Sequence, residues 1–394
     1  MYRRQMLLAA LAAGCASLTA MPAAAGDDPF RIGLILPMTG PFASTGKEIG
    51  AAVRLYVAQH GETVAGRRIE VVLKDDGGVA DATKRIAQEL IVHDKVSVLA
   101  GFGLTPLALA TAPLTVRAKV PMVVMAAATS AITEKSPYVT RTSYTTPQVA
   151  SVIARWAAGS GIKTMVTLVS DYGPGLDSEA SFTRSFEAAG GKMLGTLRVP
   201  LQNPDFAPFL QKLADLRPDG VYVFVPSGVG APFMKQYIER GLDRSGIRLI
   251  SEGGITDDEI LDSEGDPALG AITGFHYSAA HDSALNRAFV TAFMAANPGM
   301  RPNFMAVGGY DGMALIYKAL EKTGGGGGGD GDALIGAMKG MSWESPRGPI
   351  AIDPETREIV QNVYMRKVER VDGALWNVEF ETFEAVKDPG KAPS

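Results

Sequence analysis

The sequence predicts an α/β fold built from two doubly wound parallel sheets. Strand-like and helix-like segments alternate with short loops from residue 27 to about 142, and a second series of the same kind starts near Pro147. Such alternation implies right-handed crossovers between parallel strands. The 394 residues are also too many for one ordinary core, so we expect two domains.

The first β-α unit lies between Arg31 and Gly61. Ile32–Leu36 is a short apolar run, typical of a strand buried on both faces of a sheet. A loop of Pro, Gly, Ser and Thr follows, and apolar residues then recur on one helical face: Ile49, Ala52, Val53, Tyr56 and Val57. Thr45 and Glu48 have the spacing of a capping box, which predicts that the helix starts at Thr45. The free N–H groups at such a start favour anions.

The other elements follow in chain order. In the first half they are strand Ile69–Leu73, helix Ala82–Ile91, strand Val96–Ala100, helix Pro106–Arg117 and strand Met122–Met125. In the second half they are strand Thr164–Val169, helix Leu176–Ala189, strand Lys192–Val199, helix Phe206–Leu216, strand Gly220–Val225, helix Ala231–Gly241 and strand Ile247–Ser251. The remainder predicts helices Ala284–Ala296 and Met305–Glu321, and two strands within Asn362–Phe383.

The first 25 residues have the pattern of a secretory signal peptide. A positive segment with Arg3 and Arg4 precedes an apolar stretch, Met6–Ala20, and the small residues Ala23–Ala25 suit signal peptidase. We therefore expect a periplasmic protein. Cleavage after Ala25 removes the one cysteine, Cys15, and leaves a chain that cannot form a disulfide. The alternative is a lipid anchor at Cys15, although the Leu usual three residues before such a cysteine is absent.

Composition and motifs argue against several functional classes. The 38 basic and 42 acidic residues give a net charge of −4, which is unlike a nucleic-acid-binding surface. The sequence has no G-x-S-x-G motif, and its four histidines show no metal-ligand spacing. Gly101-Phe102-Gly103 lacks the third glycine of a dinucleotide fingerprint, and acidic pairs such as Asp257-Asp258 are interpreted as loop and helix-start charges. We therefore expect no enzyme activity, no metal and no cofactor.

Four loops at predicted strand ends are rich in small and hydroxyl residues: Gly101–Thr105, Ala126–Ser130, Ser170–Gly173 and Ser251–Gly254. Ligands of open α/β sheets bind outside the carboxyl ends of the strands. Small residues leave backbone N–H groups accessible, and threonine hydroxyls add donors, which suits a carboxylate. Any one loop is explained as a turn, but four in two facing halves favour a ligand cleft.

The chain resembles the periplasmic substrate-binding proteins of ABC transporters, of the leucine/isoleucine/valine-binding (type I) family. The resemblance covers the mature chain and rests on the segments IGLILPMTGPFASTG, VAGRRIEVVLKDDGGVADATKRIAQELI, KVPMVVMAAATSAIT, SDYGPG and ISEGG. It implies two lobes joined by three hinge crossings, near 142–144, 274–277 and 358–362. The expected first lobe is then 27–143 plus 277–358, the second is 144–276 plus 359–386, and 387–394 form a tail. It also implies a monomer with a membrane permease as partner.

The resemblance also implies a ligand site between the lobes. Thr105, Ala127 and Thr129 match the positions that hold the ligand carboxylate, and Tyr172 matches a tyrosine that closes over the ligand. Glu252 matches the glutamate that binds an ammonium group. Pro226 stands where the family has a second tyrosine, and Thr45, beside Phe42, replaces another. The complete predicted site is Phe42, Phe102, Gly103, Leu104, Thr105, Ala127, Ala128, Thr129, Tyr144, Tyr172, Pro226 and Glu252.

The missing tyrosines shift the expected ligand away from an amino acid. The aromatic residues Phe42, Phe102, Tyr144 and Tyr172 would suit a flat apolar body, and some family members bind aromatic carboxylates. We expect a small aromatic acid of the benzoate, phenyl-keto-acid or cinnamate kind, with Glu252 accepting from a ligand hydroxyl. The alternatives are a branched-chain or other hydrophobic amino acid, for which Glu252 would pair with the ammonium, and a ligand-sensing receptor domain.

Overall fold

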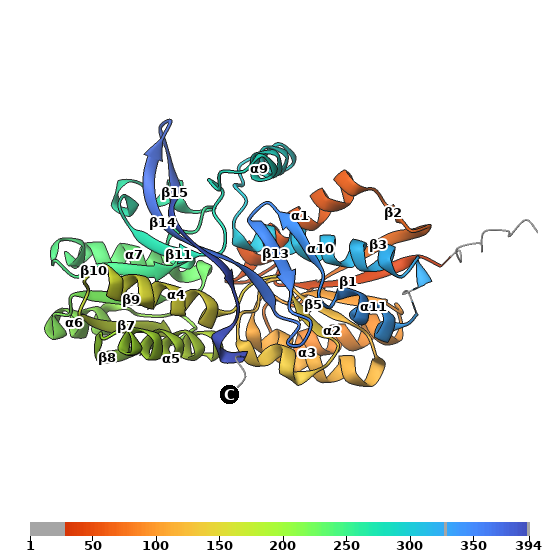
Figure 1. The fold of residues 1–394 in the computed structure, drawn as a ribbon, viewed down its shortest axis with the longest axis horizontal. Helices are drawn as coiled ribbons and strands as arrows, with labels where there is room; N and C mark the ends of the chain where they lie inside the picture. Colours follow the sequence, from red (N-terminus) through yellow and green to blue (C-terminus); the bar gives the residue numbers. More distant parts are fainter. Residues whose placement is uncertain (1–27, 327–328, 392–394) are drawn as a thin grey trace, which may run out of the picture.

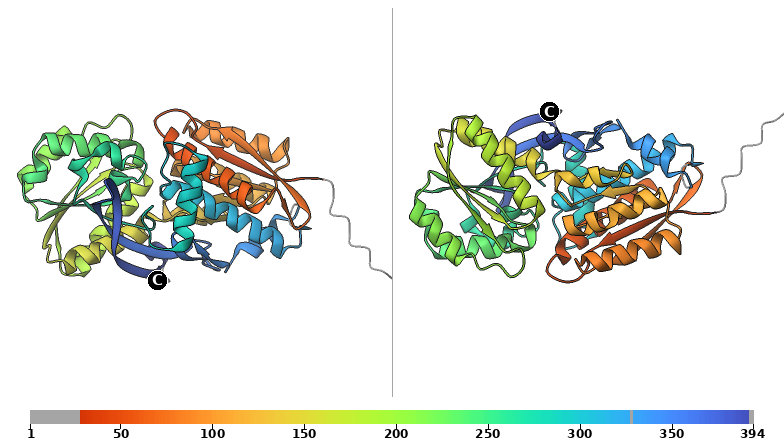
Figure 2. Two further views of the ribbon diagram at one scale, coloured as in Figure 1. Left: turned by 90° about the horizontal axis from the view of Figure 1, so that it is seen from above. Right: turned by 90° about the horizontal axis from the view of Figure 1, so that it is seen from below.

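The computed structural model describes residues 28–326 and 329–391. The predicted signal peptide and Cys15 lie outside them. Among the described residues, no helix combines the length and apolar character needed to cross a bilayer. The chain forms two α/β bodies side by side, and the C-terminal segment lies where they meet (Figure 2).

The first body is organised on a six-stranded sheet with the order β2-β3-β1-β4-β5-β6. Its strands are β1 Phe30–Leu36, β2 Thr63–Val64, β3 Arg67–Asp75, β4 Val98–Gly101, β5 Met122–Val124 and β6 Val139–Arg141. All pairings are parallel except that of β2 with β3. In Figure 1, helices α2 (Ala80–Val92) and α3 (Thr105–Ala118) lie below this sheet, and α1 (Ala43–His60) and α10 (Phe304–Lys322) lie above it.

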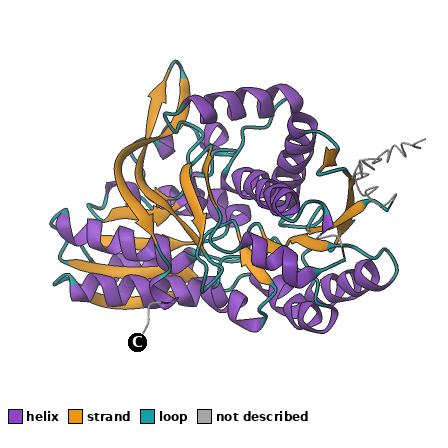
Figure 3. Cartoon of the chain, turned by 45° about the vertical axis from the view of Figure 1, so that its right-hand side comes forward, coloured by secondary structure: helices purple, strands orange, loops and turns teal. Residues whose placement is uncertain are grey.

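The second body is organised on a nine-stranded sheet with the order β12-β13-β14-β11-β10-β9-β7-β8, and β15 pairs with β14. The parallel part comprises β7 Thr164–Ser170, β8 Lys192–Val199, β9 Gly220–Phe224, β10 Arg248–Glu252 and β11 Ile272–Phe275. Helices cover both of its faces (Figure 3): α4 (Thr146–Gly159), α5 (Gly173–Ala188), α6 (Ala207–Leu216) and α7 (Gly230–Glu239).

Side chains of the second sheet alternate between two apolar cores, as strand geometry requires. On β9, Val221 and Val223 pack with Phe233 of α7, whereas Tyr222 packs on the opposite face with Phe182 of α5. Both doubly wound sheets that the sequence predicts are therefore present.

Within the described residues, the chain passes between the sheets at three places. The first follows β6, because α4 packs on the second sheet, and the second follows β11, because α9 (Ala284–Ala296) packs on α1. The third crossing follows α11 (Gly331–Met338), where β12 (Ser342–Ser345) and β13 (Gly348–Ile352) lead into β14 (Ile359–Val371). Strand β14 then forms a hairpin with β15 (Ala374–Val386). Arg347, between β12 and β13, donates to the carbonyl oxygens of Thr142 and Ser143 at the first crossing. The exact lobe bounds stay a prediction.

The predicted capping box at Thr45 is wrong. Helix α1 begins earlier, at Ala43, and its N-cap, Phe42, makes no side-chain hydrogen bond. Glu48 does not reach back to the helix start, because its carboxylate accepts a hydrogen bond from the backbone N–H of Asn303, which precedes α10. A long-range contact thus replaces the local one.

Candidate functional site

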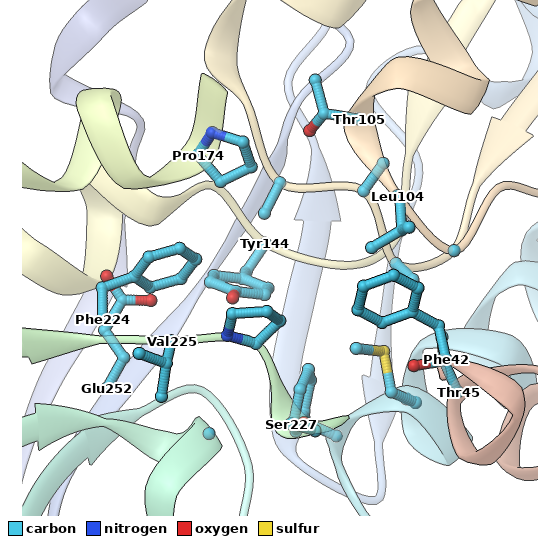
Figure 4. A pocket seen from close by; sticks show the side chains of 18 of the residues that line it. Phe42, Thr45, Leu104, Thr105, Tyr144, Pro174, Phe224, Val225, Ser227 and Glu252 are labelled. Atoms are coloured by element: carbon cyan, nitrogen blue, oxygen red, sulfur yellow. The ribbon is translucent and has the colours of Figure 1, made fainter. Parts of the chain in front are cut away.

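A cavity lies between the two sheets, where loops after β4, β5, β7, β9 and β10 face one another (Figure 4). Its empty space, about 530 Å³, includes a part that is open to solvent. Its walls are Phe42, Thr45, Gly103, Leu104, Thr105, Ala126, Ala127, Ala128, Tyr144, Tyr172, Pro174, Phe224, Val225, Pro226, Ser227, Glu252, Gly254, Phe304 and Met305. Every residue of the predicted site except Phe102 and Thr129 is among them.

Two threonine hydroxyls lie at one end of the cavity, one in the wall that the first body forms and one behind it. Thr105 begins α3, and its Oγ1 lies 3.0 Å from Oγ1 of Thr129, which stands directly behind the cavity wall. Across the gap, Gly173 begins α5, and a Cβ at this position would lie only 2.9 Å from Oγ1 of Thr129. The starts of α3 and α5 therefore converge on one end of the cavity. The positive ends of two helix dipoles and a hydroxyl favour an anion there.

Arg141 shapes the same end from outside the cavity. Its buried guanidinium donates to the carbonyl oxygens of Ala127 and Thr129, and its Nε donates to Oε2 of Glu358 at 2.6 Å. These contacts occupy two carbonyl oxygens that would otherwise be available to repel an anion in the cavity. Sequence reasoning missed Arg141, which ends the short buried strand β6, because no local pattern indicates a buried ion pair.

Aromatic rings form the middle of the cavity. The rings of Tyr172 and Phe224 stack with centroids 6.2 Å apart and an interplanar angle of 24°. Tyr144 lies edge-on to Phe304, at 6.1 Å and 89°, and is stacked from behind by His276, at 4.8 Å and 24°. In Figure 4, Phe224 and Tyr144 lie between Glu252 and Thr105. The arrangement suits a flat ring.

Glu252 ends β10 and closes the side of the cavity that belongs to the second body. The side chain is buried, and its Oε1 lies within hydrogen-bond distance of the hydroxyls of Tyr222, at 2.6 Å, and Ser178, at 2.8 Å. Oε2 has no hydrogen-bond partner. Burial raises the pKa of Glu252 to about 8, although the hydroxyls of Tyr222, Ser178 and Tyr144 favour the charged form. At neutral pH the carboxyl group therefore holds a proton most of the time.

A second group of carboxyls joins the two bodies near the cavity. The backbone N–H of Asn303 donates to Glu48 of α1 at 3.3 Å, and its side-chain amide donates to Asp257 at 3.1 Å. Burial, together with the charges of Glu259 and Asp258, raises the pKa of Glu48 well above its usual range and that of Asp257 to about 7. Asp257 and Asp258, expected as loop and helix-start charges, are buried. A bridge of this kind has no local sequence signal.

Several sequence expectations differ from the observed site. Phe102 is fully buried in the apolar core beside α3 rather than in the cavity, because its positive φ of 68° belongs to a turn that precedes the helix. Phe304 and Met305 line the cavity but were missed, since they come from a helix remote in sequence that returns to the first body. Phe224 ends β9, so the rule of strand ends could have identified it. In the described part of the chain, no group of three or more His, Cys, Asp or Glu is placed to hold a metal ion.

Comparison with known proteins assigns the family. A model of the periplasmic binding protein family matches residues 29–374, and the chain belongs to this family. A solved solute-binding protein of an ABC transporter from Rhodopseudomonas palustris BisB5, in complex with 3,4-dihydroxybenzoic acid, is 61% identical. The match covers 92% of this chain and 99% of that one, with a TM-score of 0.90.

Two further relatives differ in what their names say. A solute-binding protein from Rhodopseudomonas palustris HaA2, in complex with p-hydroxybenzoic acid, is 44% identical over 93% of this chain and 100% of that one, with a TM-score of 0.89. A Leu/Ile/Val-binding protein homolog from Brucella melitensis biotype 1 is 46% identical over 372 residues, which is 93% of this chain and 95% of the relative.

Proposed function

We propose that this periplasmic binding protein is the solute-binding component of an ABC importer and holds a small aromatic acid of the hydroxybenzoate type between its lobes. The observation that carries the proposal is the order of groups along the cavity. Two helix starts and a threonine hydroxyl lie at one end, aromatic rings in the middle, and a buried acid at the other end. The protein captures and releases this ligand without changing it chemically.

The ligand carboxylate would lie at the end formed by Thr105 and the start of α5. The Thr105 hydroxyl can donate to the carboxylate while it accepts from Thr129, because each hydroxyl carries one proton and two lone pairs. Ala127 and Ala128, small residues after β5, let a ligand approach the backbone closely. Tyr172, on the loop before α5, would close over the ring.

The aromatic ring of the ligand and the substituent opposite its carboxylate would fill the remaining part of the cavity. Tyr172, Phe224 and Tyr144 offer flat apolar surface, and Glu252 offers an oxygen without a partner at the far side. A ring hydroxyl there would supply the missing hydrogen bond. Two relatives with 61% and 44% identity are complexes with 3,4-dihydroxybenzoic and p-hydroxybenzoic acid, which supports this ligand class.

A hydrophobic amino acid is the alternative ligand, and it is tested because the Brucella relatives are named as Leu/Ile/Val-binding protein homologs. Its ammonium would need an ionised Glu252, but burial holds the pKa of this carboxyl at about 8. Pro226, in place of a tyrosine, has neither a hydroxyl nor a backbone N–H to offer. Both features disfavour a charged amine.

A thermal-shift screen of the mature protein, stripped of co-purified ligand, tests the proposal. The panel contains 3,4-dihydroxybenzoate, 4-hydroxybenzoate, benzoate, cinnamate, leucine and valine. A ligand at a hundred times its Kd adds about 2.7 kcal/mol to the free energy of unfolding, which raises the Tm by several degrees. We expect stabilisation by the hydroxybenzoates. Stabilisation by leucine or valine alone would overturn the ligand assignment.

We further propose that the protein works in the periplasm as a monomer after loss of residues 1–25, and that a membrane permease is its partner. The net charge of −4 supports the absence of nucleic acid among its partners. A ligand-sensing receptor role would use the same cavity with a different partner. Co-purification with a permease from membranes, dependent on added aromatic acid, would favour transport over sensing.

A further inference from the structure

Glu252 belongs to a closed triangle of oxygen atoms behind the cavity. Its Oε1 lies 2.6 Å from the Tyr222 hydroxyl and 2.8 Å from Oγ of Ser178, and these two hydroxyls lie 2.6 Å apart. The three residues come from α5, β9 and β10, and all three side chains are buried. Neither Ser178 nor Tyr222 lines the cavity.

Both hydroxyls contact the same carboxyl oxygen, and this leaves the other without a partner. Oε2 of Glu252 is buried and unpaired, although its side chain lines the cavity. A buried oxygen without a hydrogen bond is unfavourable, so this atom can accept one from a ligand hydroxyl, beside the Tyr144 hydroxyl that also interacts with the carboxyl group. The Phe182 ring, stacked on Tyr222 with centroids 4.1 Å apart, holds the tyrosine in the orientation that produces this asymmetry.

The number of protons in the triangle determines what Oε2 can do. Three contacts of 2.6–2.8 Å join three oxygens, and each needs a proton. Tyr222 and Ser178 supply two, so an ionised Glu252 would leave one contact between lone pairs. A proton on Oε1 completes the ring, with each residue donating once and accepting once. Oε2 is then the carbonyl oxygen of a carboxylic acid, which accepts a hydrogen bond but carries no charge.

We propose that Ser178 and Tyr222 are positioning residues that present Oε2 of Glu252 as a neutral hydrogen-bond acceptor. The cavity therefore selects aromatic acids that carry a ring hydroxyl opposite the carboxylate over aromatic acids whose ring carries no hydrogen-bond donor. The proposal rests on the proposed function and deepens it. An uncharged acceptor matches a phenol, which donates one hydrogen bond, better than an ammonium, which requires a counter-charge.

Ligand analogues test the proposal on the unmodified mature protein. Calorimetric Kd values are compared for 4-hydroxybenzoate, benzoate and 4-fluorobenzoate, because fluorine resembles the hydroxyl in size but lacks its proton. We expect 4-hydroxybenzoate to bind at least about tenfold more tightly than the other two, since they leave Oε2 unpaired. Equal affinity for all three overturns the selectivity and leaves the proposed function intact. Absence of binding by every aromatic acid overturns the proposed function itself.

Variants then distinguish a positioning role of Ser178 and Tyr222 from a general structural role. Tyr222→Phe and Ser178→Ala each remove one hydroxyl, and we expect each to reduce the preference for 4-hydroxybenzoate over benzoate several-fold with the benzoate Kd unchanged. Ser181→Ala is the matched control, because it removes a buried hydroxyl of α5 that donates to the carbonyl oxygen of Pro147, outside the triangle and the cavity wall, and it should keep the preference. Equal weakening of both ligands in the Ser178 and Tyr222 variants would indicate a structural role and overturn the proposal.

The ultraviolet spectrum of bound 4-hydroxybenzoate gives an independent readout. If Oε2 accepts from the phenol, the bound ligand keeps the absorbance of its phenol form at pH 7. A phenolate spectrum at this pH would show that the proton had moved off the ligand and would overturn the assignment of Glu252 as an acceptor.

Discussion

Replacement of Thr105 by Val removes one hydroxyl from the carboxylate end of the cavity and keeps the shape of the side chain. Thr105 is buried, and its Oγ1 lies 3.0 Å from Oγ1 of Thr129. If the hydroxyl also donates to a buried ligand carboxylate, its loss costs about 1–3 kcal/mol, which raises the Kd about 5- to 150-fold. Isothermal titration with 4-hydroxybenzoate measures the change.

Two matched variants make this result specific. Thr105→Ser keeps the hydroxyl and should bind within about threefold of the unmodified protein, a difference of roughly 0.7 kcal/mol. Thr129→Val loses the contact between the two hydroxyls but removes no group from the cavity wall, so we expect at most about a tenfold loss. Unchanged affinity in Thr105→Val, with a normal Tm, would refute the placement of the ligand carboxylate at this end.

Three further predictions concern closure and stability. The folded-state pKa values of Glu48 and Asp257 lie above their usual values, so the native protein binds more protons than the unfolded chain. The stabilisation that these protons give at low pH is lost as the pH rises, for Asp257 between about 4 and 7. In Glu48→Gln the Tm should therefore fall less steeply between pH 5 and 8, and a slope identical to that of the unmodified protein would contradict this. Arg141→Met leaves the buried Glu358 without its charged partner, although the Thr133 hydroxyl still donates to it, and urea unfolding should show a loss of about 3–5 kcal/mol in the free energy of unfolding. A loss below about 1 kcal/mol would argue against the buried pair. Gly173→Ala places a methyl group where the two lobes approach each other, and calorimetry should show weaker ligand binding, by at least severalfold, with little change in Tm.

The sequence predicts the parts of the site that depend on local pattern. These residues, Thr105, Ala127, Tyr172 and Glu252, lie at or shortly after the end of a strand. Parallel strands bring their ends to one edge of a sheet, so the four residues meet in the cavity. Phe102 follows a strand too, but its left-handed backbone conformation turns the ring into the core. The hydrophobic periodicity of the sequence does not predict a left-handed conformation at a single residue.

The remaining parts depend on contacts between distant segments. Phe304 reaches the cavity from a helix that returns from the second lobe, and only the tertiary path places it there. The partners of Glu252, which are Ser178 in a helix and Tyr222 in a buried strand, look like ordinary core residues in the sequence. The bond from Asn303 to Glu48 replaced the expected capping box for the same reason.

Competition calorimetry tests the central claim most directly. The ligand-free mature protein is titrated with 4-hydroxybenzoate, and the titration is repeated in the presence of a large excess of L-leucine. The account predicts one site per chain for the aromatic acid and no change in its apparent Kd when leucine is present. Binding of leucine with displacement of the aromatic acid, or binding of leucine alone, would contradict the account.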